Sequence, residues 1–198
     1  SKAGVTPDQI DYILAGDLLN QCISSTFGLL DFQIPFLGQY GACSTMAQTL
    51  LLSAVMVESG AAERAVAVTS SHFCSAERQF RTPLEYGAQR TPTAQWTATA
   101  SGCAIVGKDG AVKIRRGLAG KIVDLGVKDA ANMGAAMAPA AFATLRAHFD
   151  DLHCAPEDYD VIITGDLGRL GSELLHGLLE KDGIRADVQD CGVMIFDT

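Results

Sequence analysis

The chain has 198 residues, of which 48% are hydrophobic and 19% charged, and its formal net charge is -8. This much apolar sequence can bury a core and argues against disorder, while the acidic balance argues against a general nucleic-acid binder. No apolar run reaches the length of a membrane-spanning helix, and the first residues lack the apolar region of a signal peptide. The six cysteines contain no Cys-x-x-Cys pair, which predicts reduced, mostly buried thiols and no zinc site.

Taken in chain order, the first elements alternate between strands and helices. A short buried strand is expected near the N-terminus, followed by a buried helix over Met46–Val57 that is closed by Gly60. Further strands are predicted by apolar and alternating runs, over Arg64–Ser70, Thr97–Val106, Val112–Arg115 and Gly117–Leu125.

The remaining stretches predict two helices and one long loop. One helix is expected over Ala135–Phe149, with Pro139 as a candidate first residue. The other is expected over Leu170–Glu180 and ends at Gly183. The 26 residues from Ser71 to Trp96 show no clear periodicity. A loop of this length in a compact domain is usually functional.

A short segment is repeated within the chain. Pro7–Leu18 recurs as Pro156–Leu167 at a constant offset of 149 residues, with six of twelve positions identical. One short match can arise by chance, but a duplicated α/β fold with two similar halves explains it better. We therefore expect an N-terminal half over residues 1–110 and a C-terminal half over residues 111–198. The abrupt start and finish predict a fold that is incomplete at both ends.

Cys43 is the first candidate for a functional residue, because it directly precedes the predicted helix over Met46–Val57. A helix N-terminus presents backbone N–H groups and a positive dipole end, which favour a thiolate or a bound anion. A nucleophilic cysteine also needs a base. His148, His153 and His176 are expected on surface helices, whereas His72 follows a strand, where α/β sites form. A loop histidine without a catalytic role explains His72 equally well.

Other polar residues are weaker candidates. Asp17 ends the first predicted strand, although an acid there is often only a turn residue. Arg78, Arg81 and Arg90 lie in the long loop. A guanidinium can bind a small carboxylate in bidentate fashion, but a solvated surface position is commoner.

Several motifs together resemble the thiolase superfamily, and within it the stage V sporulation protein AD family. They are Gly16-Asp17-Leu18, Gly41-Ala42-Cys43-Ser44-Thr45, Ser70-Ser71-His72, Gln79-Phe80-Arg81, Glu85-Tyr86-Gly87-Ala88-Gln89 and Pro92-Thr93-Ala94-Gln95-Trp96-Thr97. The resemblance covers essentially the whole chain. It implies an α/β chain with a thiolase-like, duplicated α-β-α-β-α layered fold.

The resemblance also implies a function. The chain would be a non-catalytic binding protein of spore formation that takes dipicolinic acid (pyridine-2,6-dicarboxylate), with or without calcium, for uptake into the developing spore. The implied ligand-binding residues are Asp17, Cys43, Ser44, His72 and Arg81, and no cofactor or protein-bound metal is implied. The implied partners are a second copy of the chain, paired through the strand that leads into Cys43, and the other stage V sporulation A proteins. The chain would lie peripherally at the spore inner membrane.

One departure from the superfamily bears on mechanism. Condensing enzymes of the ketoacyl synthase III type carry a catalytic histidine after the second-half strand, where this chain has Ile163–Arg169 without a histidine. Cys43 therefore lacks the partner for condensation and is expected to line a pocket. Two alternatives stay open: a cysteine-dependent acyltransferase of the ketoacyl synthase III type, and a structural subunit without a small-molecule ligand.

Overall fold

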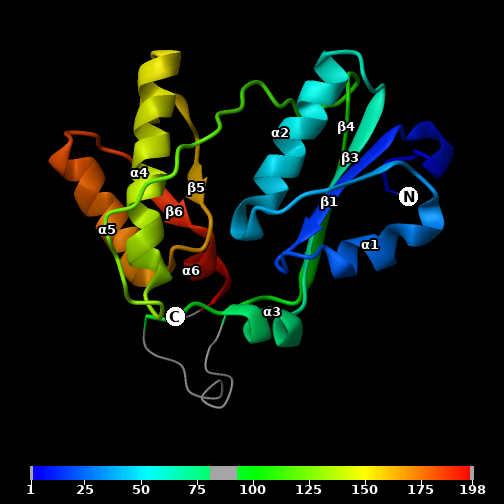
Figure 1. Ribbon diagram of the computed structural model, residues 1–198. Coiled ribbons are helices and arrows are strands. Elements are labelled where there is room, and N and C mark those ends of the chain that lie inside the picture. The colour runs from blue at the N-terminus through cyan, green and yellow to red at the C-terminus, as the bar shows by residue number, and fades with distance from the viewer. Residues whose placement is uncertain (1, 81–92, 197–198) are drawn as a thin grey trace. The chain divides into compact units, whose positions relative to one another are not determined.

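The computed structural model describes residues 2–80 and 93–196, so the predicted ligand residue Arg81 lies outside the described residues. The described chain forms two compact units (Figure 1). One contains the residues up to 80 together with Thr97–Gly117, and the other contains residues 93–96 and the chain from Leu118 onward. The assignment of residues 1–110 and 111–198 as two thiolase-like halves stays a prediction.

The described strands of the first unit are β1 (Tyr12–Asp17), β2 (Phe36–Gly38), β3 (Arg64–Ser71) and β4 (Ala100–Gly107). They form one sheet in the order β2-β1-β3-β4. The two central strands β1 and β3 run parallel to each other, β2 is parallel to β1, and β4 is antiparallel to β3. The backbone N–H groups of Arg64 and Glu63 donate to the Asp11 carboxylate, at 3.0 and 2.7 Å, and lower its pKa.

Two helices cover the faces of this sheet. All residues of β1 from Ile13 to Asp17 are buried, which requires cover on both faces. α1 (Ile23–Leu29) packs on β1 and β3, and α2 (Thr45–Glu58) packs on β1, β3 and β4 from the opposite side (Figure 1). The buried stripe of α2 repeats every four residues, which is the spacing of one helical face, with Thr45, Thr49, Ser53 and Val57. The predicted helix over Met46–Val57 is confirmed as α2, and the strands predicted near the N-terminus and over Arg64–Ser70 are confirmed as β1 and β3.

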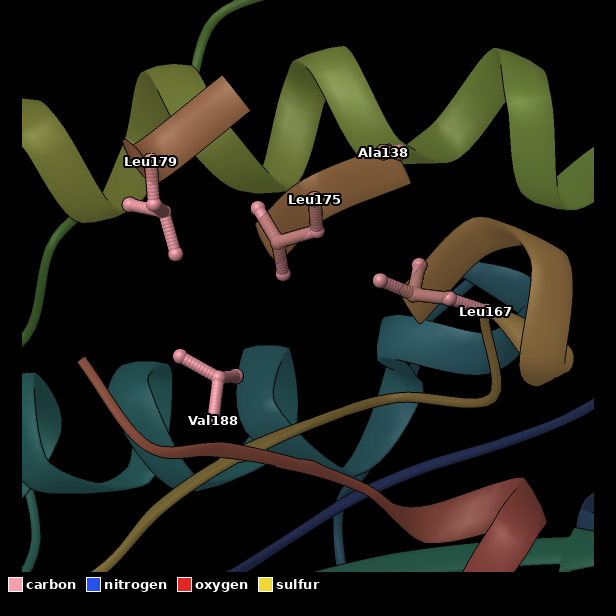
Figure 2. Close-up of a cluster of buried hydrophobic side chains, with 5 residues drawn as sticks. All are labelled: Ala138, Leu167, Leu175, Leu179 and Val188. Carbon is pink, nitrogen blue, oxygen red and sulfur yellow. The ribbon is translucent and has the colours of Figure 1, made fainter. Parts of the chain in front are cut away.

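The second unit packs two helices on a short parallel sheet. α4 (Met133–Leu152) and α5 (Gly168–Lys181) contact each other, and the described strands β5 (Ile162–Thr164) and β6 (Val188–Asp190) pair. α6 (Cys191–Ile195) follows β6. Figure 2 shows side chains from the two helices, from the residue before α5 and from β6 meeting in one apolar core, formed by Ala138, Leu167, Leu175, Leu179 and Val188.

The repeated sequence segment has the same local structure in both units. The short 3-10 turns η1 (Pro7–Gln9) and η5 (Pro156–Asp158) keep the offset of 149. In each, the side chain of the last residue accepts the backbone N–H three residues earlier, at 3.0 Å in the first copy and 2.9 Å in the second. The strand that follows pairs in parallel with the next strand, with Ile13 opposite Phe36 and Ile162 opposite Val188. The turn and the parallel pairing of the strand that follows are therefore common to both copies.

The predicted strands over Val112–Arg115 and Gly117–Leu125 are wrong. The described backbone there forms no strand, Val112 is 92% exposed, and Ile122 is fully exposed. A strand is stable only when a neighbouring strand accepts and donates its backbone hydrogen bonds. Alternating side chains in the sequence do not reveal whether that neighbour exists.

Two helix predictions also need correction. Pro139 lies inside α4 and does not begin it. The helix starts at Met133 because the Asn132 side chain accepts the Ala135 backbone N–H at 3.1 Å and caps it. The stretch predicted as a long loop contains α3 (Phe73–Phe80), whose single buried residue among those described is Ala76. A helix of two turns is too short for its periodicity to stand out.

Two further short 3-10 turns, η2 (Leu30–Phe32) and η3 (Ala42–Ser44), complete the first unit. Within the part of the chain that the structure describes, no helix combines the length and the apolar character needed to cross a bilayer.

Candidate ligand site

Three of the predicted site residues lie near the carboxyl ends of the parallel strands in the first unit. Asp17 is the last residue of β1, His72 follows β3, and Cys43 lies in η3, between β2 and α2. Parallel strands end at the same edge of a sheet, and this edge is where open α/β sheets bind ligands. The structure therefore brings the three segments to one edge, as the sequence suggests.

Cys43 is exposed and lies two residues before α2 begins at Thr45. The residue before it, Ala42, has a φ of +47°, in the left-handed region that residues with a side chain seldom adopt. The Ser44 hydroxyl donates to the Gly41 carbonyl at 2.8 Å, and the Thr45 hydroxyl donates to the Ala42 carbonyl at 2.8 Å. These two bonds stabilise the strained turn. Ser44, a predicted ligand residue, therefore also stabilises the backbone around Cys43.

Asp17 is buried in the sheet, with only 1% of its surface exposed. Its Oδ2 accepts the Ser25 backbone N–H at 3.1 Å, whereas its Oδ1 has no partner among the described residues. Ser70, directly opposite Asp17 on β3, also has a buried hydroxyl without a described partner. Buried polar atoms are normally hydrogen-bonded. Because Asp17 bonds to α1 and Cys43 precedes α2, the two residues share the sheet edge but not a face of the sheet.

His72 is exposed at the start of α3. Its carbonyl oxygen accepts the backbone N–H groups of Ser75 and Ala76, at 3.2 and 3.0 Å, and so begins the helix. The backbone of His72 thus has a structural role, which leaves the imidazole to contact solvent or a ligand.

One side chain joins the three segments. Gln79 of α3 donates from Nε2 to the Tyr40 hydroxyl at 3.1 Å, and its Oε1 accepts the Asn20 backbone N–H at 3.3 Å. Asn20 stands three residues after Asp17, and Tyr40 stands three residues before Cys43. Gln79 belongs to one of the motifs that carry the family resemblance, but its spacing in the sequence indicates no role.

The thiols and metal-binding groups limit what the site can do. All six cysteines lie in the described part, none forms a disulfide, and each is exposed or half-buried. The prediction of mostly buried thiols is therefore wrong. Four of them lie at or near the start of a helix or 3-10 turn, Cys154 follows the end of α4, and Cys103 lies on an exposed position of β4. The described residues contain no group of three or more His, Cys, Asp or Glu that could hold a metal ion.

The loop after β5 contains no histidine. Three side chains form hydrogen bonds with the backbone of this loop. It connects β5, which ends at Thr164, to α5, which begins at Gly168. Gln95 donates from Nε2 to the Asp166 carbonyl at 2.8 Å, and Asp166 Oδ1 accepts the Gly168 backbone N–H at 3.0 Å. The buried Asp190 accepts the Leu167 backbone N–H at 2.7 Å. These side chains stabilise the loop.

The family model described as Stage V sporulation protein AD (SpoVAD) matches residues 1–198. The chain belongs to the stage V sporulation protein AD family. A curated relative in this family, Stage V sporulation protein AD of Bacillus subtilis (strain 168), is 44% identical over 98% of this chain and 59% of the relative. The SpoVAD-family chain thus spans less than two thirds of the length of that relative.

Several solved structures are similar to the chain at low sequence identity. The tetronic acid condensing enzyme AbyA1 has a TM-score of 0.64 at 16% identity, over 96% of this chain and 66% of that one. The 3-oxoacyl-[acyl-carrier-protein] synthase III of Aquifex aeolicus VF5 has a TM-score of 0.63 at 15% identity, over 95% and 64%. A variant of Xanthomonas campestris OleA with bound lauric acid and lauroyl-CoA reaches 0.65 at 12% identity, over 95% and 63%. These similarities confirm the thiolase-like α/β fold of the SpoVAD-family chain.

Proposed function

We propose that this chain forms a dipicolinic acid-binding part of a sporulation protein, which acts in uptake of the ligand into the developing spore. The observation that carries the proposal is the sheet edge of the first unit, where the segments of Asp17, Cys43 and His72 are joined through Gln79. Membership of the SpoVAD family supports the role in sporulation. The protein would act as a peripheral protein at the spore inner membrane, beside the other stage V sporulation A proteins.

The groups at this sheet edge can donate hydrogen bonds to the carboxylates of a small ligand. The start of α2, a helix of 14 residues, carries the positive end of the helix dipole next to Cys43 and Ser44. The exposed imidazole of His72 and the guanidinium of Arg81 would add donors. The Asp17 carboxylate is buried against α1 and repels a bare dianion, so it would hold the Ser25 backbone N–H at the sheet edge, and any link to the ligand would need calcium or another bridging group.

Titration calorimetry with dipicolinate, with and without calcium, tests this proposal. We expect saturable binding that weakens about tenfold or more in Cys43→Ala and in His72→Ala, which corresponds to a loss of about 1.4 kcal/mol for each tenfold change. The matched control is Cys74→Ala, which removes another exposed thiol from the same unit and is expected to leave the affinity unchanged. The proposal fails if neither this chain nor a protein of the relative's full length binds dipicolinate.

In the proposed function Cys43 lines the ligand site and transfers no acyl group. The alternative is an acyltransferase that uses Cys43 as its nucleophile, and it draws on the strained turn at Ala42 and the exposed thiol. Acyl transfer through Cys43 would leave a thioester on its sulfur. After incubation with acetyl- and lauroyl-coenzyme A, mass spectrometry is expected to find unmodified Cys43. An acyl adduct that is present in the wild type and absent in Cys43→Ala would favour the acyltransferase.

We also propose that two copies pair through β2. Among the described strands, β2 is at the edge of its sheet and pairs only with β1. Its free edge offers unpaired backbone groups to another strand, and exposed apolar residues lie on and near it, namely Phe27, Leu30, Phe32, Leu37 and Tyr40. In sedimentation velocity we expect a dimer for the wild type and for the surface control Val112→Lys, and a monomer for Leu37→Lys. A monomeric wild type would contradict the pairing.

A further inference from the structure

We propose that Gln79 is a positioning residue, which sets the location of the Cys43 turn relative to the loop after Asp17. Its effect on dipicolinate rests on the proposed function, whereas its effect on Cys43 can be measured without any ligand. Gln79 lies on α3, the helix that follows His72. Its side chain bonds to the Asn20 N–H, in the loop after Asp17, and to the Tyr40 hydroxyl, in the segment before Cys43.

The chemistry of the amide explains why this residue suits the task. A primary amide both donates and accepts hydrogen bonds at the end of one side chain. Gln79 uses its two ends for contacts 59 and 39 residues away in the chain, at 3.3 and 3.1 Å. The Cys22 thiol bond to the Gln39 carbonyl and the Gln39 N–H bond to the Ala15 carbonyl also hold the first two segments together, at 3.1 and 2.8 Å. The Gln79 bonds add α3 to this contact, so their removal loosens the Tyr40 side chain and the Asn20 loop from α3.

The connection from Tyr40 to Cys43 is short and fixed. Gly41 is closely surrounded, because a Cβ there would lie 2.5 Å from Ser44 Oγ and 2.6 Å from Gln48 Oε1, and these side chains would have to move. Ala42 holds the left-handed conformation, and the Thr45 hydroxyl accepts the Gly41 backbone N–H at 3.2 Å. A shift of Tyr40 is therefore passed on to Cys43 with little absorbed between them. The Gln79 bond to Tyr40 thereby controls the orientation of the thiol.

The test compares alkylation rates of individual cysteines by iodoacetamide, followed by mass spectrometry on the full chain. We expect Gln79→Ala to change the rate at Cys43 by about threefold or more, the scale of one lost hydrogen bond, and to leave Cys74 unchanged. Tyr40→Phe removes a single oxygen and is expected to act in the same direction. The double variant is expected to match Gln79→Ala, because both substitutions break the same bond. Gln189→Ala, at an exposed glutamine of the second unit, is the matched control.

A conservative variant separates positioning from simple destabilisation. Gln79→Glu keeps acceptors for the Asn20 N–H and for the Tyr40 hydroxyl, so the Cys43 rate is expected to return close to that of the wild type. Its added negative charge is expected to weaken dipicolinate binding about threefold or more. An unchanged ratio of Cys43 to Cys74 rates in Gln79→Ala and Tyr40→Phe, or additive effects in the double variant, would overturn the proposal. If the wild type binds no dipicolinate, the proposed function fails while the alkylation rates still decide the role of Gln79.

Discussion

Gly16→Ala is expected to lower the free energy of unfolding by about 2–3 kcal/mol, the usual cost of forcing extra volume into a packed interior. A Cβ at Gly16 would overlap the Gln39 carbonyl oxygen and lie 2.8 Å from Thr45 Cγ2. The Gln39 backbone cannot easily move away, because its N–H donates to the Ala15 carbonyl at 2.8 Å and its carbonyl accepts the Cys22 thiol at 3.1 Å. The added methyl therefore pushes against backbone.

Urea unfolding followed by circular dichroism measures this effect. The matched control is Gly28→Ala in α1, where a Cβ has no neighbour within 4 Å. That variant is expected to be as stable as the wild type or up to about 1 kcal/mol more stable, because alanine favours the helix. Equal stability of Gly16→Ala and the wild type would show that the chain before Cys43 does not lie against β1 at Gly16.

Gly16→Ala also links stability to the site. The overlap falls on Gln39, four residues before Cys43, in the segment whose Tyr40 is held by Gln79. At temperatures where the variant is still folded, dipicolinate affinity is expected to fall together with a changed Cys43 alkylation rate. Gly28→Ala is expected to change neither quantity.

The sequence identifies elements wherever a pattern has a local physical cause. The apolar run over Met46–Val57 predicts α2, and the positive φ of Gly60, +79°, agrees with its place at the helix end. The repeated segment predicts two similar turns and strands, and in both copies a 3-10 turn leads into a strand that pairs in parallel. In these cases, neighbouring residues in the sequence determine the structure.

Features that depend on distant partners are missed. The alternation over Val112–Arg115 indicates a strand, but the described backbone there has no partner strand. Pro139 is a reasonable helix start, yet the Asn132 cap lies further upstream and extends α4 to Met133. Asp17 and Cys43 stand out in the sequence, whereas the burial of Asp17 and the bonds of Gln79 depend on residues 8 to 59 positions away.

The second large effect is expected at the crossing of α4 and α5, where two glycines meet. A Cβ at Gly171 would lie 2.8 Å from the Leu167 Cβ and 2.9 Å from the Gly134 Cα. A Cβ at Gly134 would in turn overlap the Leu167 carbonyl oxygen and lie 3.1 Å from the Gly171 backbone. The two helices therefore touch through backbone atoms, and this contact holds them over the core that contains Leu175 and Leu179.

Gly171→Ala is expected to lower the free energy of unfolding by about 2 kcal/mol, as an overpacking cost of about 3 kcal/mol is partly offset by about 1 kcal/mol of helix propensity. Gly177→Ala, on the same helix, is the matched control, because a Cβ there meets nothing within 4 Å. The control is expected to gain about 1 kcal/mol, since only the propensity changes. Urea unfolding gives both values, and hydrogen exchange should show faster exchange in α4 and α5 for Gly171→Ala alone. If the helices touch at Gly134 and Gly171, Gly171→Ala lowers the free energy of unfolding while Gly177→Ala on the same helix raises it. Equal gains in the two variants would mean that the helices do not cross there.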